Sequence, residues 1–295
     1  MSYMKGNMHR MNRREFLRRS AALGAVAAFP ATAWPAEVRR ASDVIELGPQ
    51  KIKVSRMAIG TGTNGGGRSS AQMRKLGAAG VADLMWDGYD HGVFLLDTAD
   101  TYGSHDAIKI LLKKVPREKV VIMTKTEARS GAEMKTDLDR YRQEMGVDFI
   151  DIVLLHCVFA PKWDEVNKPQ MDVLSEAKDK KLIRSVGLSC HSVDTMKLAA
   201  KSPWLDIFMG RINPASTRMD ADTATIMPLL ADLKAKGKGI VGIKVLGEGT
   251  LVEHLDDALR FVVTKDLVHC FSIGCESRAE FLDNFDRIAK VSQPS

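Results

Sequence analysis

The chain has 295 residues, of which 45% are hydrophobic and 27% charged, and its formal net charge is +6. This composition is ordinary for a soluble globular protein, and a core of this size needs no disulfide support. The length allows two domains, or one β/α barrel, which typically takes about 250 residues.

Residues 1–33 differ from the rest of the chain. A basic stretch that contains Arg13-Arg14 precedes a short apolar run, Ala21–Ala33, which ends in an A-x-A pattern. This order is typical of a secretory signal with its cleavage site, and the arginine pair resembles a twin-arginine export signal. We therefore expect a signal peptide at 1–33, the twin-arginine translocation machinery as a partner, and a periplasmic or otherwise exported location. The alternative is a disordered basic tail beside an amphipathic helix.

The export segment carries most of the net charge. Residues 1–33 contain six Lys or Arg and one Glu, so residues 34–295 contain 37 basic and 36 acidic residues and have a net charge of +1. This balance gives no support to nucleic-acid binding, which needs a basic patch on the folded domain. No segment after the export signal reaches the roughly 18 continuous apolar residues of a membrane helix, so we predict no membrane span.

Four cysteines stand at positions 157, 190, 270 and 275. None falls in a C-x-x-C pair, so we expect neither a zinc motif nor a redox motif, and no metal ligands. Buried thiols are the simplest interpretation. Because Cys157 and Cys190 end neighbouring predicted strands, a disulfide between them stays open.

Apolar runs alternate with amphipathic stretches after residue 40. Two runs at 44–47 and 51–55, joined by Gly48-Pro49, predict a hairpin. Eight further runs predict strands at 57–61, 94–99, 120–125, 150–156, 185–190, 206–213, 239–246 and 270–274. The clearest helical patterns lie at 106–114, 136–146, 228–239, 254–265 and 278–291. Eight alternating units predict one (β/α)8 TIM barrel over 34–295, and the lack of a G-x-G-x-x-G segment disfavours a Rossmann fold.

Polar residues stand at the C-terminal ends of three consecutive predicted strands, where β/α barrels hold their active sites. Asp97 and Tyr102 follow the second strand, Lys125 ends the third, and His156 ends the fourth. Each has an ordinary alternative: a helix cap, a packed loop aromatic, a lysine that reaches solvent, and a satisfied core histidine. Burying a lysine and an aspartate costs several kcal/mol unless they pair, so stability alone does not explain the set.

In these residues the chain resembles the aldo-keto reductase family. The D-T-A-x-x-Y-G segment, the strand-three lysine and the strand-four histidine match the family's catalytic tetrad in order, within a resemblance from about Leu47 to Asn284. The resemblance implies a hairpin that plugs the barrel bottom, and hydride transfer between a nicotinamide cofactor and an aldehyde, ketone or sugar carbonyl. It implies Tyr102 as general acid/base, with Lys125, held by Asp97, lowering the pKa of Tyr102. His156 is expected to hydrogen-bond the carbonyl oxygen.

The resemblance also implies a set of cofactor contacts, with departures from the family pattern. Ser189 stands where the family binds the nicotinamide carboxamide, but Cys190 replaces the usual Asn. Met209 stands at a usual Gln and Ile243 at a usual stacking aromatic, and Arg211 and Asn213 are candidates to compensate. The expected contacts are Gly60, Thr61, Asp97, Ser189, Cys190, Asn213, Lys244, Leu246, Gly247, Gly274, Glu276, Glu280 and Asn284.

The cofactor is expected to be NAD or NADP. The family usually places basic residues after the last strand to hold the 2′-phosphate of NADP, but here Glu276 and Glu280 occupy that segment. Carboxylates repel a phosphate and accept hydrogen bonds from a bare ribose, so the segment favours NAD. Two alternatives remain: Arg278 reaches the phosphate, or the glutamates are only a solvated helix start, where acids are favoured.

Two other functions stay open: a catalytically silent, cofactor-binding regulatory barrel, and a barrel isomerase or lyase without nicotinamide. The sequence does not identify the small-molecule carbonyl or alcohol substrate, nor the oligomeric state. Loops at Thr63–Gly77 and around Phe159–Lys168 are expected to shape the substrate site. Trp163 is expected either to line the pocket or to be exposed.

Overall fold

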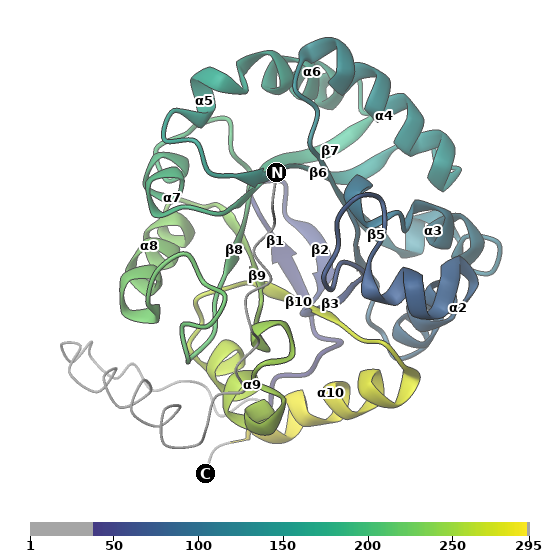
Figure 1. The fold of residues 1–295 in the computed structure, drawn as a ribbon, viewed down its shortest axis with the longest axis vertical. Coiled ribbons are helices and arrows are strands. Elements are labelled where there is room, and N and C mark those ends of the chain that lie inside the picture. The colour runs from purple at the N-terminus through teal and green to yellow at the C-terminus, as the bar shows by residue number, and fades with distance from the viewer. Residues whose placement is uncertain (1–37, 294–295) are drawn as a thin grey trace.

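The computed structural model describes residues 38–293, which form a closed barrel of parallel strands ringed by helices (Figure 1). The strands run in the order β10-β3-β4-β5-β6-β7-β8-β9, so neighbours in the chain pair and β10 closes the barrel on β3. Their bounds are β3 Met57–Gly60, β4 Leu95–Asp97, β5 Val121–Thr126, β6 Ile150–Val158, β7 Ile183–Cys190, β8 Ile207–Arg211, β9 Gly239–Ile243 and β10 Cys270–Gly274. The predicted TIM barrel is confirmed; the predicted signal peptide lies outside the described residues.

The helices pack around the strands as an outer ring (Figure 1). Their bounds are α2 Ala71–Asp90, α3 His105–Leu111, α4 Gly131–Met145, α5 Trp163–Val166, α6 Lys168–Asp179, α7 Val193–Ala199, α8 Thr223–Ala235, α9 Leu255–Thr264 and α10 Arg278–Val291. Helix α4 shows why they begin and end where they do. The hydroxyl of Ser130 caps its first turn by accepting the N–H of Glu133, and Gly146 ends it with a φ of +68°.

A hairpin of β1 (Val44–Leu47) and β2 (Ile52–Ser55) closes the end of the barrel where the strands begin. Leu47 and Ile52 are fully buried in the cluster of apolar side chains that fills the barrel interior, together with Ile207 at the start of β8. Gly48 makes the turn with a φ of +69° and lies so close to Ile207 that a Cβ would clash. The predicted hairpin and its role as a plug are therefore confirmed.

Apolar side chains form two layers, one inside the barrel and one between the strands and the helices. The inner layer includes Leu95, Met123, Ile152 and Val241, all fully buried or nearly so. Strand residues between them, such as Val153, point outward into the larger cluster under the helices. Since the hairpin seals one end and apolar residues fill the middle, the interior opens at the C-terminal ends of the strands.

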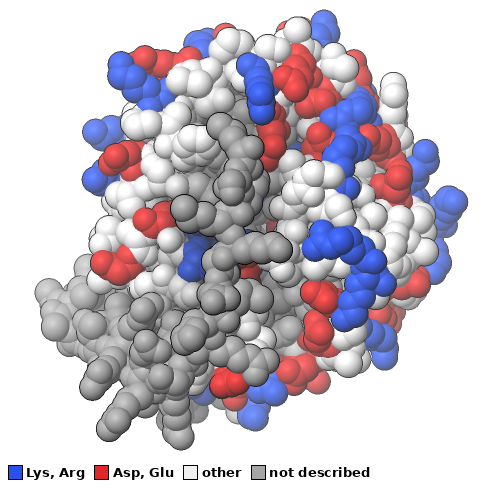
Figure 2. Space-filling model, viewed as in Figure 1, with Lys and Arg blue, Asp and Glu red and all other residues white. Residues whose placement is uncertain are grey.

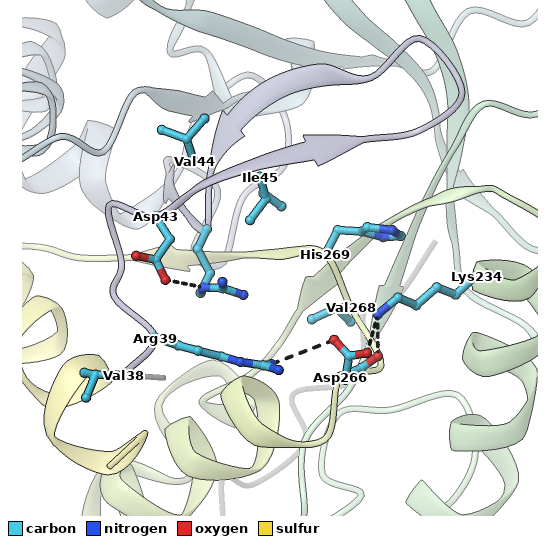
Figure 3. Close-up of a pocket in the computed structure, with 10 residues that line it drawn as sticks. Val38, Arg39, Asp43, Val44, Ile45, Lys234, Asp266, Val268 and His269 are labelled. Carbon is cyan, nitrogen blue, oxygen red and sulfur yellow. Dashed lines mark hydrogen bonds and ion pairs between the residues drawn. The ribbon is translucent and has the colours of Figure 1, made fainter. Parts of the chain in front are cut away.

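A separate cavity of about 460 Å³ lies beside the hairpin, at the opposite end from the predicted active site. Its charged side chains pair with one another (Figure 3). Asp266 accepts from Lys234 at 3.0 Å and lies 3.8 Å from Arg39, while Asp43 lies 3.2 Å from Arg56. These pairs tie the start of the described chain to α8 and to the turn before β10.

Two expectations about the loops are wrong. Trp163 neither lines the active-site pocket nor is exposed, because its side chain is fully buried in the outer core, 6.2 Å from the ring of Trp204. The stretch expected to be a substrate loop over 63–77 turns into α2 at Ala71, where the hydroxyl of Ser70 caps the helix. Only its first part, up to Gly67, lines the active-site cavity.

All four cysteines are free thiols, so the structure does not form the disulfide that the sequence left open. Cys190, Cys270 and Cys275 are buried, as expected, whereas Cys157 is partly exposed. Within residues 38–293, no helix is long and apolar enough to cross a membrane. Acidic and basic side chains are interspersed over the face drawn in Figure 2.

Candidate active site

A cavity of about 870 Å³ opens at the C-terminal ends of the barrel strands, and all four predicted catalytic residues line it. Asp97 ends β4, Lys125 stands near the end of β5, and His156 lies near the end of β6. Tyr102 ends the short 3-10 helix η2 (Asp100–Tyr102), directly after β4. Neighbouring parallel strands thus bring together residues as far apart in the chain as Asp97 and His156, which are separated by 59 positions.

The centre of the site is an ion pair between Lys125 Nζ and Asp97 Oδ1 at 2.5 Å. The side chains are 1% and 7% exposed, so the pair is shielded from water. The second carboxylate oxygen of Asp97 accepts the hydroxyl of Ser272 at 2.6 Å, and Lys125 also donates to the carbonyl oxygen of Thr98 at 2.8 Å. Burial would lower the pKa of Lys125, but Asp97 raises it above its ordinary value, so the lysine stays charged.

Tyr102 is placed between this lysine and His156. Lys125 Nζ lies 4.7 Å from the centre of the tyrosine ring, within the range of a cation–π contact. Tyr102 Oη lies 3.4 Å from His156 Nε2, and the two rings meet edge to face. The hydroxyl, the imidazole and the ammonium therefore converge on one side of the cavity.

Burial changes the acid–base balance that the sequence predicted. It raises the pKa of Tyr102, and Lys125 lowers that pKa by less, so the net shift is upward. Lys125 thus lowers the pKa of Tyr102 as expected, but burial outweighs it, and Tyr102 is a neutral proton donor at neutral pH. Burial and the charge of Lys125 hold the pKa of His156 well below its usual range, so the imidazole is neutral.

A glycine-rich loop after β3 holds the tyrosine ring, a feature that the sequence analysis missed. A Cβ on Gly62 would lie 2.3 Å from two ring carbons of Tyr102, and one on Gly65 would lie 2.6 Å from another. Real Cβ atoms do not approach this closely, so only glycine allows the loop to lie against the ring. The signal available in the sequence was the high glycine content of residues 60–67, which read GTGTNGGG.

The predicted cofactor contacts divide into two groups. Besides the tetrad, the cavity is lined by eight of them: Gly60, Ser189, Lys244, Leu246, Gly274, Glu276, Glu280 and Asn284. Thr61, Cys190, Asn213 and Gly247 are not among the lining residues. The structure thus brings most of the set together in one groove, which runs from the tetrad to the start of α10.

The residues outside the lining have structural partners instead. The side-chain oxygen of Asn213 accepts the N–H groups of Ala215 and Thr217, and its nitrogen donates to the carbonyl oxygens of Thr217 and Lys244. Asn213 therefore holds the loop after β8 and has no group left for a cofactor. Cys190 is 1% exposed and its thiol lies against the carbonyl oxygen of Ser192. The hydroxyl of Thr61 donates to the carbonyl oxygen of Asp97.

Polar groups able to bind a ligand lie at both ends of the groove. At one end, the side-chain oxygen of Asn284 is buried and has no hydrogen-bond partner within the described chain, so it can accept from an adenine amino group. At the other end, Ser189 Oγ accepts the backbone N–H of Cys157 at 2.8 Å, which leaves the hydroxyl hydrogen to donate to a carboxamide. The volume lies within the usual range for ligand sites, about 300–1,000 Å³.

The departures from the family pattern also face the cavity. Met209 and Ile243 both line it. An apolar side chain thus stands where the family usually has a glutamine, and an aliphatic one where it usually has a stacking aromatic residue. Arg211 lines it too, but its guanidinium contacts His191 and Asp220, the latter at 3.2 Å. Lys244 pairs with Glu248. These cations are thus partly neutralised by acids of the same loops.

The arrangement provides a proton donor and two polarising groups at one point of a groove. Such a set can protonate an oxygen while hydride reaches the adjacent carbon, because the neutral His156 can donate a hydrogen bond to the same oxygen. A barrel with a Lys–Asp pair, a tyrosine and a histidine at this rim defines a reductase-type site.

Comparison with known proteins agrees with this class. The chain belongs to the aldo/keto reductase family, whose model matches residues 56–293. It is 28% identical over 211 residues to the NADH-specific methylglyoxal reductase of Escherichia coli K12. This match covers 64% of this chain and 63% of that protein, so the chain spans slightly less than two thirds of this relative's length. An aldo-keto reductase structure from Pseudomonas aeruginosa superposes with a TM-score of 0.70 at 23% identity, over 85% of this chain and 97% of that one. A Bombyx mori aldo-keto reductase in complex with NADP gives a TM-score of 0.63 at 17% identity, over 85% and 92%.

The loop against Tyr102 gives a first prediction. We expect Gly62→Ala to displace the tyrosine ring and lower kcat/KM for carbonyl reduction by about 100-fold, as a misplacement of about 1 Å does. The control is Gly66→Ala in the same loop, where an added Cβ meets nothing within 4 Å. Equal kcat/KM for the two variants would show that the loop does not position the ring.

Proposed function

We propose that this protein is an NAD(P)-dependent oxidoreductase that transfers hydride between a nicotinamide cofactor and an aldehyde, ketone or sugar carbonyl. The observation that carries the proposal is the buried Lys125–Asp97 pair facing Tyr102, with His156 at the hydroxyl. The cofactor supplies the hydride, and this chain supplies the proton and the polarising groups. A silent regulatory barrel needs none of these groups, and burying an ion pair is costly.

In reduction, Tyr102 Oη gives its proton to the substrate oxygen as negative charge develops there. His156 Nε2, 3.4 Å from the hydroxyl, hydrogen-bonds the same oxygen. Lys125 stabilises the resulting tyrosinate, and Asp97, which accepts a hydrogen bond from Ser272, fixes the ammonium in place. In oxidation the same tyrosine acts as the base. Burial raises the pKa of Tyr102, so the hydroxyl carries its proton near neutral pH, the state that reduction requires.

The tyrosine hydroxyl can be tested alone. We expect Tyr102→Phe to lower kcat for carbonyl reduction about 10²–10⁴-fold, the usual contribution of a general acid, while the dissociation constant for the cofactor stays unchanged. Tyr89→Phe, on α2 and away from the cavity, is the matched control. Steady-state kinetics and cofactor fluorescence titration measure both effects. Near-normal turnover of Tyr102→Phe would refute the assignment.

We infer NAD rather than NADP as the preferred cofactor. Glu276, Glu280 and Asp283 line the cavity at the start of α10, where a 2′-phosphate would otherwise bind. Lys75 pairs with Glu276 at 3.3 Å, and Glu280 accepts the backbone N–H of Glu276 at 2.8 Å. Glu280 therefore also holds the backbone just before α10, in line with the alternative that the glutamates belong to the start of this helix. The NADH-specific enzyme of E. coli is a relative in line with this preference.

Arg278 does not reach this end of the groove. Its Nε donates to Asp87 on α2 at 2.9 Å, and the residue is not among those that line the cavity. The arginine that the sequence named as the candidate partner of a 2′-phosphate thus points to a neighbouring helix. This placement supports the carboxylates as the groups that decide the choice.

Dissociation constants for NADH and NADPH test this inference. We expect NADH to bind at least about tenfold more tightly, because like charges in close contact cost enough to reverse a preference. Glu276→Lys should narrow or reverse the ratio, and Arg278→Ala should leave it unchanged. Tighter binding of NADPH that is lost in Arg278→Ala would show that the arginine sets the choice.

We further infer that the protein is exported by the twin-arginine route after it folds. The support is the order of the basic stretch, the apolar run and the A-x-A pattern, together with a family match that begins only at residue 56. This route carries folded proteins, so the cofactor would be bound before export. Because free cofactor is scarce outside the cytoplasm, slow cofactor release or a recycling partner is expected.

Export depends on the first arginine pair if this inference is correct. We expect Arg13-Arg14→Lys-Lys to retain the protein in the cytoplasm. The same segment offers a matched control, Arg18-Arg19→Lys-Lys, which changes a second arginine pair and should leave export intact. Cell fractionation with immunodetection measures how much of each variant is exported. Unchanged delivery of the first variant would contradict the twin-arginine route.

A further inference from the structure

Three side chains with metal-binding atoms meet in the cavity at the ends of β5 and β6. The carboxylate of Glu127, one ring nitrogen of His156 and the thiol of Cys157 have ligand atoms that all lie within 4.8 Å of one another. Glu127 directly follows β5, and the other two are consecutive in β6. All three line the cavity. The sequence predicted no metal ligands because it contains no C-x-x-C pair, whereas this cluster is assembled from two strands.

His156 faces the cluster with a different nitrogen from the one it presents to the tyrosine. Its Nε2 lies 3.4 Å from Tyr102 Oη, while its Nδ1 lies 3.4 Å from Glu127 Oε1. Ligand atoms about 2.0–2.1 Å from a tetrahedral zinc ion are themselves about 3.4 Å apart. The imidazole and the carboxylate are thus already at the separation of two zinc ligands.

A β-bulge brings the thiol to the same side as the imidazole. Consecutive residues of a regular strand point to opposite faces, so His156 and Cys157 would not normally line one cavity. The pairing of β6 with β7 shifts between Leu155 and Val158, and Cys157 has a φ of +53°. The hydroxyl of Ser189 holds this conformation by accepting the backbone N–H of Cys157. A strained, non-glycine residue held in this way is typical of functional sites.

The ligand types select the metal. A thiolate, an imidazole and a carboxylate together suit zinc, whereas magnesium and calcium prefer oxygen ligands alone. Three protein ligands leave one tetrahedral position for water or a substrate oxygen, as in open zinc sites. A second cluster, of Asp100, His105 and Glu144, is not comparable, because Arg68 and Arg140 donate to both of its carboxylates.

We propose that Glu127, His156 and Cys157 bind one zinc ion, with loss of the thiol proton to solvent, and that the bound ion obstructs carbonyl substrates. The obstruction rests on the proposed reductase function, because the ion and its water would occupy the cavity on the other side of the imidazole that hydrogen-bonds the substrate oxygen. Metal binding itself does not rest on it. The protein would then be a reductase whose turnover is reversibly blocked by free zinc.

Direct binding is measured on the cofactor-free full-length protein, with cobalt as the spectroscopic substitute for zinc. We expect one cobalt ion per chain, with a thiolate charge-transfer band and tetrahedral d–d bands that zinc abolishes. Cys157→Ser should remove the charge-transfer band, and Glu127→Gln should weaken binding at least tenfold. Cys190→Ser, which changes the buried cysteine of the neighbouring strand, should bind as the wild type does. A charge-transfer band that persists in Cys157→Ser would overturn the site.

Kinetics test the consequence separately. We expect zinc to inhibit carbonyl reduction by the wild type in competition with the carbonyl substrate, with reversal by a chelator, and at least tenfold higher zinc to be needed for Cys157→Ser. Full turnover with the site occupied, as cobalt absorption reports, would overturn the obstruction. A protein that binds cobalt through Cys157 but reduces no carbonyl compound would contradict the reductase function and leave the metal site standing.

Discussion

The buried ion pair of Lys125 and Asp97 is the interaction on which the rest of the site depends. Removing two charges from water costs several kcal/mol per ion, and attraction repays this only where the geometry is good and the remaining polar atoms are satisfied. Here the second carboxylate oxygen receives Ser272 and the ammonium also donates to Thr98. Loss of either partner leaves an uncompensated buried charge, which typically costs about 3–5 kcal/mol. Barrel closure makes this geometry possible, because Asp97 and Ser272 come from opposite sides of β3, on β4 and β10.

The fold could be predicted from the sequence because its signals are local and repeated. Each strand is a short apolar run before an amphipathic helix, and polar residues at or near the ends of β4, β5 and β6 interrupt those runs. Because Lys125 and His156 stand near the ends of predicted strands, the sequence also predicted that they lie at the C-terminal rim of the barrel. These predictions needed only the regular alternation of β/α units and the rule that β/α barrels hold their active sites at the C-terminal ends of the strands.

The remaining site residues depend on packing between distant segments, which the sequence does not display. Ser272 lies 175 residues after Asp97 in the chain, and it supports Asp97 only because β10 pairs with β3 and closes the barrel. Asn213 is polar and near a strand end, yet the loop after β8 uses all its hydrogen-bonding groups. The pKa of Tyr102 follows the same logic: its lysine neighbour was visible in the sequence, but the extent of its burial was not.

The loop after β3 packs against two parts of the cavity lining. Gly62 lies against the ring of Tyr102. The hydroxyl oxygen of Thr63, the next residue, would lie 2.3 Å from a Cβ added to Gly274, at the end of β10. Gln72 fixes the loop between them, because its oxygen accepts the N–H of Thr63 and its nitrogen donates to Thr63 Oγ1 and, more weakly, to the carbonyl oxygen of Gly60. The same loop thus packs against both Gly274 and the ring of Tyr102. Because packed segments resist deformation, the position of the tyrosine ring depends on how this loop packs against the end of β10.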